Sequence, residues 1–217
     1  MTGSIDPLAC RYAAVASNQT HRVEVITDTE SMVKSLLGEY RKGTNTLPDR
    51  IIYLRDGVAE GQFAEVIRVE LPAIRAAARV VAPGKTVKIT VIIVKKRHHT
   101  RIFPASPQDG DRNGNVHPGT VVDTGVVHPV EFDFCNFPRL WFMLTDSHRA
   151  SQSLSGHCSS CSLSDVPRTA MLTVDVIHDE NGFKSDQLQT LIYHQSYAFA
   201  RSSTSVSLRT FPLPRSH

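Results

Sequence analysis

The stretch between residues 49 and 94 constrains the fold more than any other part of the chain. Ile51-Ile52-Tyr53-Leu54 is a short apolar run flanked by charge, the pattern of a central strand buried on both faces. Apolar residues recur at helical spacing from about Glu60 to Arg79, with a kink or break expected at Pro72. Residues 86–94 are rich in Val, Ile and Thr, which predicts a second strand. This order predicts an α/β domain.

Further elements are expected on both sides of this unit. Residues 22–26 alternate as a strand does, and Thr27 and Glu30 then predict a capping box at the start of a helix. Towards the other end we expect three strands and a last helix, at 116–123, 130–134, 172–177 and 185–201.

Length and composition limit the class of protein. The 217 residues suffice for one α/β domain, and no apolar run is long enough to span a bilayer. The N-terminal residues lack the pattern of a secretory signal, so we expect a cytoplasmic protein, with the nucleus as the other compartment. Four cysteines are too few to staple a chain of this length, so reduced thiols are expected.

Two groups of charged residues are candidates for function. Lys95, Lys96, Arg97 and Arg101 fall within seven residues, which suits contact with phosphate. With a net charge of only +3, composition alone favours a solvated strand end instead. Asp56 directly follows the predicted buried strand, where α/β sheets tend to place active sites, although an aspartate there also serves as a turn former or helix cap.

Four groups of sequence strings resemble the PIWI domains of eukaryotic Argonaute proteins. In chain order they are Arg50–Val58 with Glu60–Phe63, then Lys95–Arg101, then Pro118–Thr124 with His128-Pro129 and Glu131–Phe134, and finally Asp179–Asn181 with Arg201–Ser207. They follow the family's order and approximate spacing, and the resemblance covers about residues 4–134 and 176–208. It implies an incomplete RNase H-like fold, a mixed sheet flanked by helices.

The resemblance also implies a chemistry, two-metal hydrolysis of phosphodiesters with Mg²⁺ held by carboxylates. Asp56 matches the family's catalytic, metal-binding aspartate, and Glu24 matches its catalytic glutamate. From the residues alone, Glu24 is better explained as an exposed strand carboxylate. The family's first aspartate is expected upstream of Met1, and its last position falls in a segment after Ser207 that departs from the pattern. We therefore expect an incomplete catalytic tetrad, doubtful Mg²⁺ binding and no cleavage.

The guide-binding positions are better represented. The residues that match family contacts to the guide RNA are Lys96, Arg97, Arg101, Arg201 and Ser207, whereas Phe199 stands where the family commonly has tyrosine. The implied partners are a small guide RNA, its complementary target RNA and proteins of a silencing complex. An A-form duplex of this kind is recognised by shape, phosphate and 2′-OH contacts.

The tract at about 135–175 departs from the family. We predict a disordered, Ser-rich insertion that interrupts a partial PIWI domain at 1–208, followed by an irregular tail at 209–217. Our hypothesis is that translated intron or frame-shifted exon sequence forms this tract. The alternative is a zinc site, with His157, Cys158 and Cys161 as ligands and Cys135 or His148 as a fourth. No second paired knuckle accompanies them, which favours disorder.

One main function and two alternatives follow. The main one is a PIWI domain that binds guide and target RNA in gene silencing without slicer activity. The first alternative is a Mg²⁺-dependent, RNA-guided endoribonuclease, so enzyme activity stays open. The second is a non-functional product of an altered gene model.

Overall fold

The computed structural model describes residues 1–21, 23–95, 98, 100, 102–111, 115–137 and 171–197. In chain order the elements are β1 (Thr2–Ser4), β2 (Tyr12–Ala14), α1 (Thr29–Thr44), β3 (Arg50–Asp56), the 3-10 turn η1 (Glu60–Gln62), α2 (Phe63–Val81), β4 (Lys88–Lys95), the 3-10 turn η2 (Pro107–Asp109), β5 (Val121–Val122), β6 (Asp133–Asn136), β7 (Leu172–Asp179) and α3 (Ser185–Gln195). No helix among these residues is long and apolar enough to cross a membrane.

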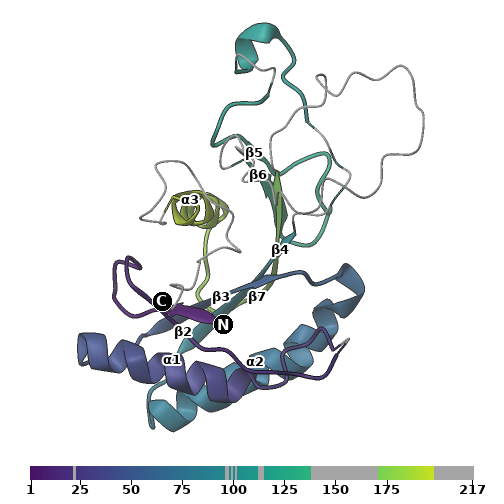
Figure 1. The fold of residues 1–217 in the computed structure, drawn as a ribbon. Helices are drawn as coiled ribbons and strands as arrows, with labels where there is room; N and C mark the ends of the chain where they lie inside the picture. Colours follow the sequence, from purple (N-terminus) through teal and green to yellow (C-terminus); the bar gives the residue numbers. More distant parts are fainter. Residues whose placement is uncertain are drawn as a thin grey trace, which may run out of the picture.

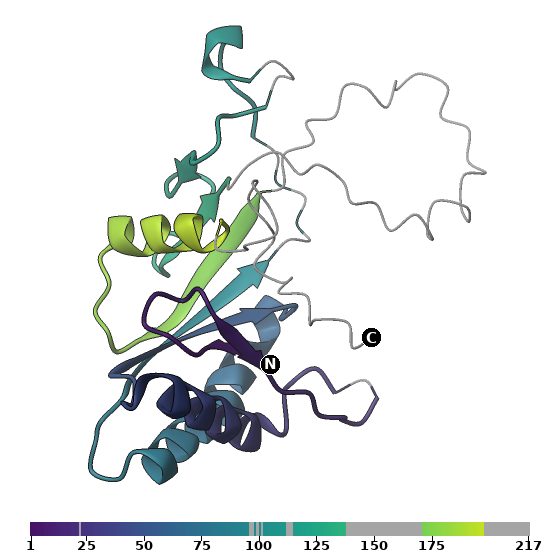
Figure 2. The same ribbon diagram turned by 60° about the vertical axis from the view of Figure 1, so that its left-hand side comes forward.

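The centre of the fold is a five-stranded mixed sheet in the order β3-β4-β7-β6-β5. β3 and β4 are parallel, and the other neighbouring strands are antiparallel. Helices α1 and α2 cover one face and α3 covers the other, while β1 and β2 form a separate ribbon beside α1 (Figures 1 and 2). The Gln195 side-chain amide of α3 donates to the Tyr12 hydroxyl of this ribbon at 2.8 Å. The predicted α/β class and the mixed, helix-flanked sheet are confirmed.

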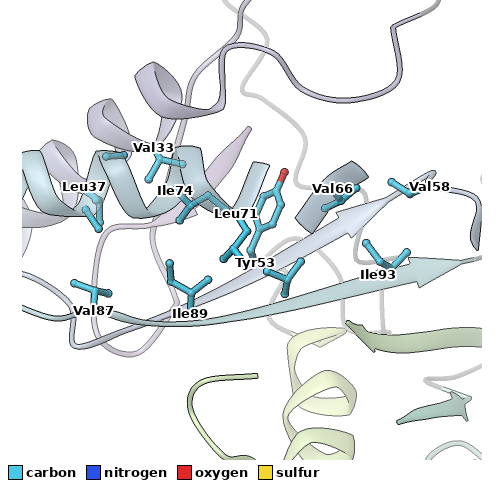
Figure 3. Packing of buried hydrophobic residues seen from close by; sticks show 13 residues of the cluster. Val33, Leu37, Tyr53, Val58, Val66, Leu71, Ile74, Val87, Ile89 and Ile93 are labelled. Carbon is cyan, nitrogen blue, oxygen red and sulfur yellow. The ribbon is translucent and has the colours of Figure 1, made fainter. Parts of the chain in front are cut away.

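The alternation of side chains along β4 builds both halves of the core. Ile89, Val91 and Ile93 point towards α1 and α2, and Figure 3 shows this face with Tyr53 of β3 directed at α2. The intervening Ile92 and Val94 pack on the α3 side. Because successive side chains of a strand point to opposite faces, an apolar run without alternation requires cover on both.

The other predicted strand of this unit, β3, is likewise covered on both faces. Ile51 and Tyr53 pack towards α2, and Ile52 and Leu54 pack towards α3. The expectation that it is a central strand is wrong for the described residues, since β3 lies at one end of the strand order.

The segment before α1 differs from the structure that its sequence predicted. Val23–Ile26 is not a strand, and α1 begins after Asp28, whose side chain makes no capping bond. The Thr29 hydroxyl instead donates to the Ile26 carbonyl at 2.7 Å, and Glu30 pairs with Lys34 at 2.5 Å. The N-cap residue is thus Asp28 and not Thr27, and the expected capping box of Thr27 with Glu30 does not form.

Two further expectations need correction. Helix α2 runs through Pro72 without a break, so of the expected kink or break the break is wrong. Arg68, whose carbonyl loses its donor, and Pro72 are both exposed residues, where water can replace the missing hydrogen bond. The strand predicted at 116–123 is reduced to Val121–Val122 with a single bridge at Val116, and the next strand begins later than expected, at Asp133.

Substitution within α2 tests the position of the core. Ile74 is fully buried against β4, so Ile74→Ala should lower the free energy of unfolding by about 3 kcal/mol, through lost burial and a cavity. The matched control is Val80→Ala on the same helix, where the side chain is 61% exposed and little change is expected. Urea denaturation measures both, and equal losses would contradict this arrangement.

A second test concerns the end of β7. Partial burial opposes ionisation of Glu180, but the Ile89 N–H and the neighbouring side chains of Arg75 and His178 lower the pKa of its carboxyl to about 2. A lowered pKa contributes stability above the ordinary value of 4.5, and this contribution is lost as the pH falls towards 2. As the pH is lowered from 4.5 towards 2, the melting temperature of Glu180→Gln should therefore fall less than that of the native chain. Glu65→Gln, at an exposed position of α2, should leave the dependence of the melting temperature on pH unchanged.

Candidate functional site

Asp56 lies where the sequence predicted it, at the carboxyl end of β3. In the ladder it stands opposite Val94 of β4, and its side chain is half-buried. Gly57 follows with φ of +77°, a backbone conformation that favours glycine, and the chain then turns so that Val58 enters the core. The aspartate is thus held at the edge of the sheet between a buried strand and a fixed turn.

Glu24 lies in the segment between β2 and α1, and its side chain is exposed. The Arg55 side chain connects this segment to the same end of β3. The Nη2 of Arg55 donates to the Glu24 carbonyl, and its Nη1 donates to the Asp56 carbonyl at 2.6 Å. A single guanidinium therefore bridges the main chains of the two residues that the resemblance identified as catalytic.

The guanidinium is itself fixed by Glu70 of α2. Arg55 Nε lies 3.2 and 3.3 Å from the two carboxylate oxygens of Glu70, which is completely buried. The same carboxylate accepts hydrogen bonds from the Tyr53 hydroxyl at 2.7 Å and from the Ile26 N–H at 2.9 Å. Burial and the adjacent carboxylate raise the pKa of the Tyr53 hydroxyl far above its ordinary value, so Tyr53 is a permanent donor.

The role of Glu70 was not predicted from the sequence, although the spacing of apolar residues around it was informative. Val66, Glu70 and Ile74 are spaced four residues apart, and all three are at most 1% exposed. A glutamate at the centre of an apolar helical stripe must be paired, since a buried charge without partners is very costly. The partners, however, come from β3 and from a segment 44 residues away, which spacing does not reveal.

The basic run is divided by the structure. Lys95, at the end of β4, forms ion pairs with Glu60 at 2.8 Å and with Asp175 of β7 at 3.1 Å. His98 Nε2 lies 3.0 Å from the Met171 carbonyl oxygen. All five predicted RNA contacts, which are Lys96, Arg97, Arg101, Arg201 and Ser207, lie outside the described residues. Their role stays a prediction.

Side chains that could bind a metal are scattered over the described residues. No group of three or more histidine, cysteine, aspartate or glutamate side chains in this part of the chain is arranged to hold an ion. Asp56 and Glu24 are therefore not part of a closed carboxylate cage there. The zinc alternative concerns His148, His157, Cys158 and Cys161, which lie outside the described residues, and Cys135, a buried thiol of β6 whose pKa is raised by burial.

Comparison with known proteins gives a consistent result. The model of the Piwi domain family matches residues 1–138. The chain is 39% identical to Protein argonaute 12 of Oryza sativa subsp. japonica, over 93% of this chain and 18% of the relative, and 38% identical to Protein argonaute of Schizosaccharomyces pombe, over 96% and 22% respectively. The chain thus spans about a fifth of the length of these relatives.

Solved structures agree with the sequence relatives. The C-terminal lobe of a budding yeast Argonaute superimposes with a TM-score of 0.66 at 30% identity, covering 85% of this chain and 35% of that chain. Kluyveromyces polysporus Argonaute with a guide RNA superimposes with a TM-score of 0.65, also at 30% identity, covering 85% and 21%.

Substitution of Glu70 tests the polar network. Glu70→Gln removes the charge that compensates Arg55, so the free energy of unfolding should fall by about 3 kcal/mol. In this variant the Ile26 amide should also exchange with deuterium faster than it does in the native chain, because its acceptor is weakened. This increase should be larger than the increase for the amides of α2. Glu65→Gln, on the exposed side of the same helix, should change neither quantity. An unchanged Ile26 exchange rate would show that Glu70 does not hold the segment.

Proposed function

Because this chain belongs to the Piwi domain family, whose fold is RNase H-like, we propose that it binds a small guide RNA and its complementary target RNA in gene silencing, without cleaving the target. The observation that carries the proposal is the family match over residues 1–138, which includes the basic residues Lys96, Arg97 and Arg101. A similar Argonaute was solved with a guide RNA, which supports RNA as the ligand class.

Phosphate contacts are assigned to five residues. Lys96, Arg97 and Arg101 follow β4, and Arg201 and Ser207 follow α3. Arginine binds phosphate through paired N–H groups, lysine acts as a point charge, and a serine hydroxyl donates a single hydrogen bond. None of these contacts identifies a base. Sequence would be read by pairing between guide and target, while the protein recognises the A-form backbone.

Cleavage is not part of the main proposal, and the reason is the set of groups around Asp56. Hydrolysis in this family depends on metal ions held by carboxylates, and Mg²⁺ is the ion we assign to the family's chemistry. At this strand end the Arg55 guanidinium, a cation, donates hydrogen bonds to the main-chain carbonyls of both Glu24 and Asp56. Within the described residues, Asp56 is not part of any group of three or more histidine, cysteine, aspartate or glutamate side chains that could hold an ion.

A slicer is the second candidate, because Asp56 lies at the carboxyl end of β3, and α/β sheets commonly place catalytic carboxylates at strand ends of this kind. Silencing-complex proteins as partners, and a cytoplasmic or nuclear location, follow only from the proposed role in gene silencing.

The proposal predicts salt-sensitive RNA binding. A short guide–target RNA duplex should bind the purified chain with an affinity that falls steeply as salt rises, because each phosphate contact releases counterions. Arg97→Ala with Arg101→Ala should lower the affinity roughly tenfold and reduce the salt slope by about 2. Fluorescence anisotropy across a salt series measures both quantities.

The matched control removes two exposed arginines of α2, by Arg68→Ala with Arg79→Ala, and changes net charge equally. Equal losses in both double variants would mean that binding is non-specific attraction to a basic protein. Incubation of the same complex with Mg²⁺ or Mn²⁺ should leave the target intact, and a cut that disappears in Asp56→Asn would favour the slicer instead.

A further inference from the structure

Lys95 differs from the rest of the basic run in its surroundings. It is the last residue of β4, and its side chain is only 19% exposed. Its ammonium group lies between two carboxylates, Glu60 of η1 and Asp175 of β7, and stands 5.6 Å from the centre of the Phe63 ring. A cation at the start of a proposed RNA-binding segment is therefore already bound inside the protein.

The two carboxylates hold Lys95 with different strength. Glu60 is mostly exposed, with 77% of its side chain accessible, so this pair alone is weakly held. Asp175 is different, because its side chain is only 12% exposed and stands directly opposite Asp133 in the β6–β7 ladder. If Lys95 moved away, Asp175 would keep a buried carboxylate beside a second aspartate and without its cation, which is a costly arrangement.

The charge state of Lys95 is also fixed. Burial opposes protonation, but the hydrogen bonds and charges of Glu60 and Asp175 outweigh it and raise the pKa of the ammonium above its ordinary value. Lys95 is thus a permanent cation whose field is cancelled locally. Only cations that meet phosphate contribute to counterion release and to affinity for RNA.

We propose that Glu60 and Asp175 keep Lys95 out of contact with RNA, so that these two carboxylates limit the strength of the phosphate-binding surface that begins at the next residue. The inference rests on the proposed RNA binding and deepens it. A phosphate oxygen and a carboxylate oxygen compete for the same ammonium protons, and Asp175 holds them at the lower cost. Neutral amides at both positions would free Lys95 for phosphate.

A cycle of variants tests this with the RNA duplex and salt series. Lys95→Gln alone should leave the dissociation constant within about twofold of the native value and the salt slope unchanged. Glu60→Gln with Asp175→Asn should tighten binding and steepen the slope by about 1, which corresponds to a further three- to fourfold loss of affinity for each fourfold rise in salt. Adding Lys95→Gln to that pair should remove the extra slope.

A matched control separates Lys95 from net charge. Glu39→Gln with Glu65→Gln also removes two acids, both about half exposed on helices, and should not add to the slope. Thermal melts establish that each variant is folded, and if the double amide fails to fold, Lys95→Gln in the native background and Glu60→Gln with and without it give the same comparison.

The outcomes are distinguishable. A Lys95→Gln variant that loses affinity and about one unit of slope in the native background would overturn the inference and leave RNA binding intact. A gain in the double amide that persists after Lys95→Gln would likewise overturn it, because the gain would then come from the general field. A native chain that binds no RNA at any salt would overturn the proposed function and this inference together.

Discussion

The buried Glu70 carboxylate determines the structure around the candidate site. A carboxylate removed from water is tolerated only when its oxygens are paired, and Glu70 meets this condition with three partners from two other parts of the chain. Through them α2 fixes Tyr53 and Arg55 of β3 and the segment that carries Glu24. One buried charge therefore links the main chains of Glu24 and Asp56 through Arg55.

Lys95 shows the same principle on the neighbouring strand. Both Arg55 and Lys95 are cations near the carboxyl ends of parallel strands, where they could in principle meet an anionic ligand. Each is instead bonded to carboxylates or carbonyls within the fold. Such groups cannot be released without leaving an uncompensated charge behind, so they stabilise the site and contribute little to binding. The proposed RNA contacts accordingly belong to the residues that follow Lys95.

The sequence predicted the elements whose pattern is local. Three elements were predicted correctly from their own residues, namely β3, β4 and α2. In each of them the spacing of apolar residues within the segment indicates the secondary structure and the buried face. The end of β3 was recognisable from its pattern, but it was the resemblance to Argonaute PIWI domains that singled out Asp56. Val23–Ile26 was wrongly predicted as a strand. Its long-range hydrogen bonds are to the side chains of Glu70 and Arg55, and its other bonds are local turn contacts. The parallel pairing of β3 with β4 and the division of the basic run at Lys95 likewise depend on long-range contacts.

The pairing of β3 with β4 has a consequence for how binding and cleavage relate. Asp56 and Val94 are partners in the ladder, so the predicted catalytic aspartate lies one strand spacing, about 5 Å, from the residue that precedes Lys95, although nearly forty residues separate them in sequence. An RNA backbone held by the segment after Lys95 would begin its contact beside Asp56. Binding at this edge needs only the cations of that segment, whereas cleavage needs carboxylates from several elements at once. Loss of some carboxylates would therefore abolish cutting and leave the contact with RNA in place.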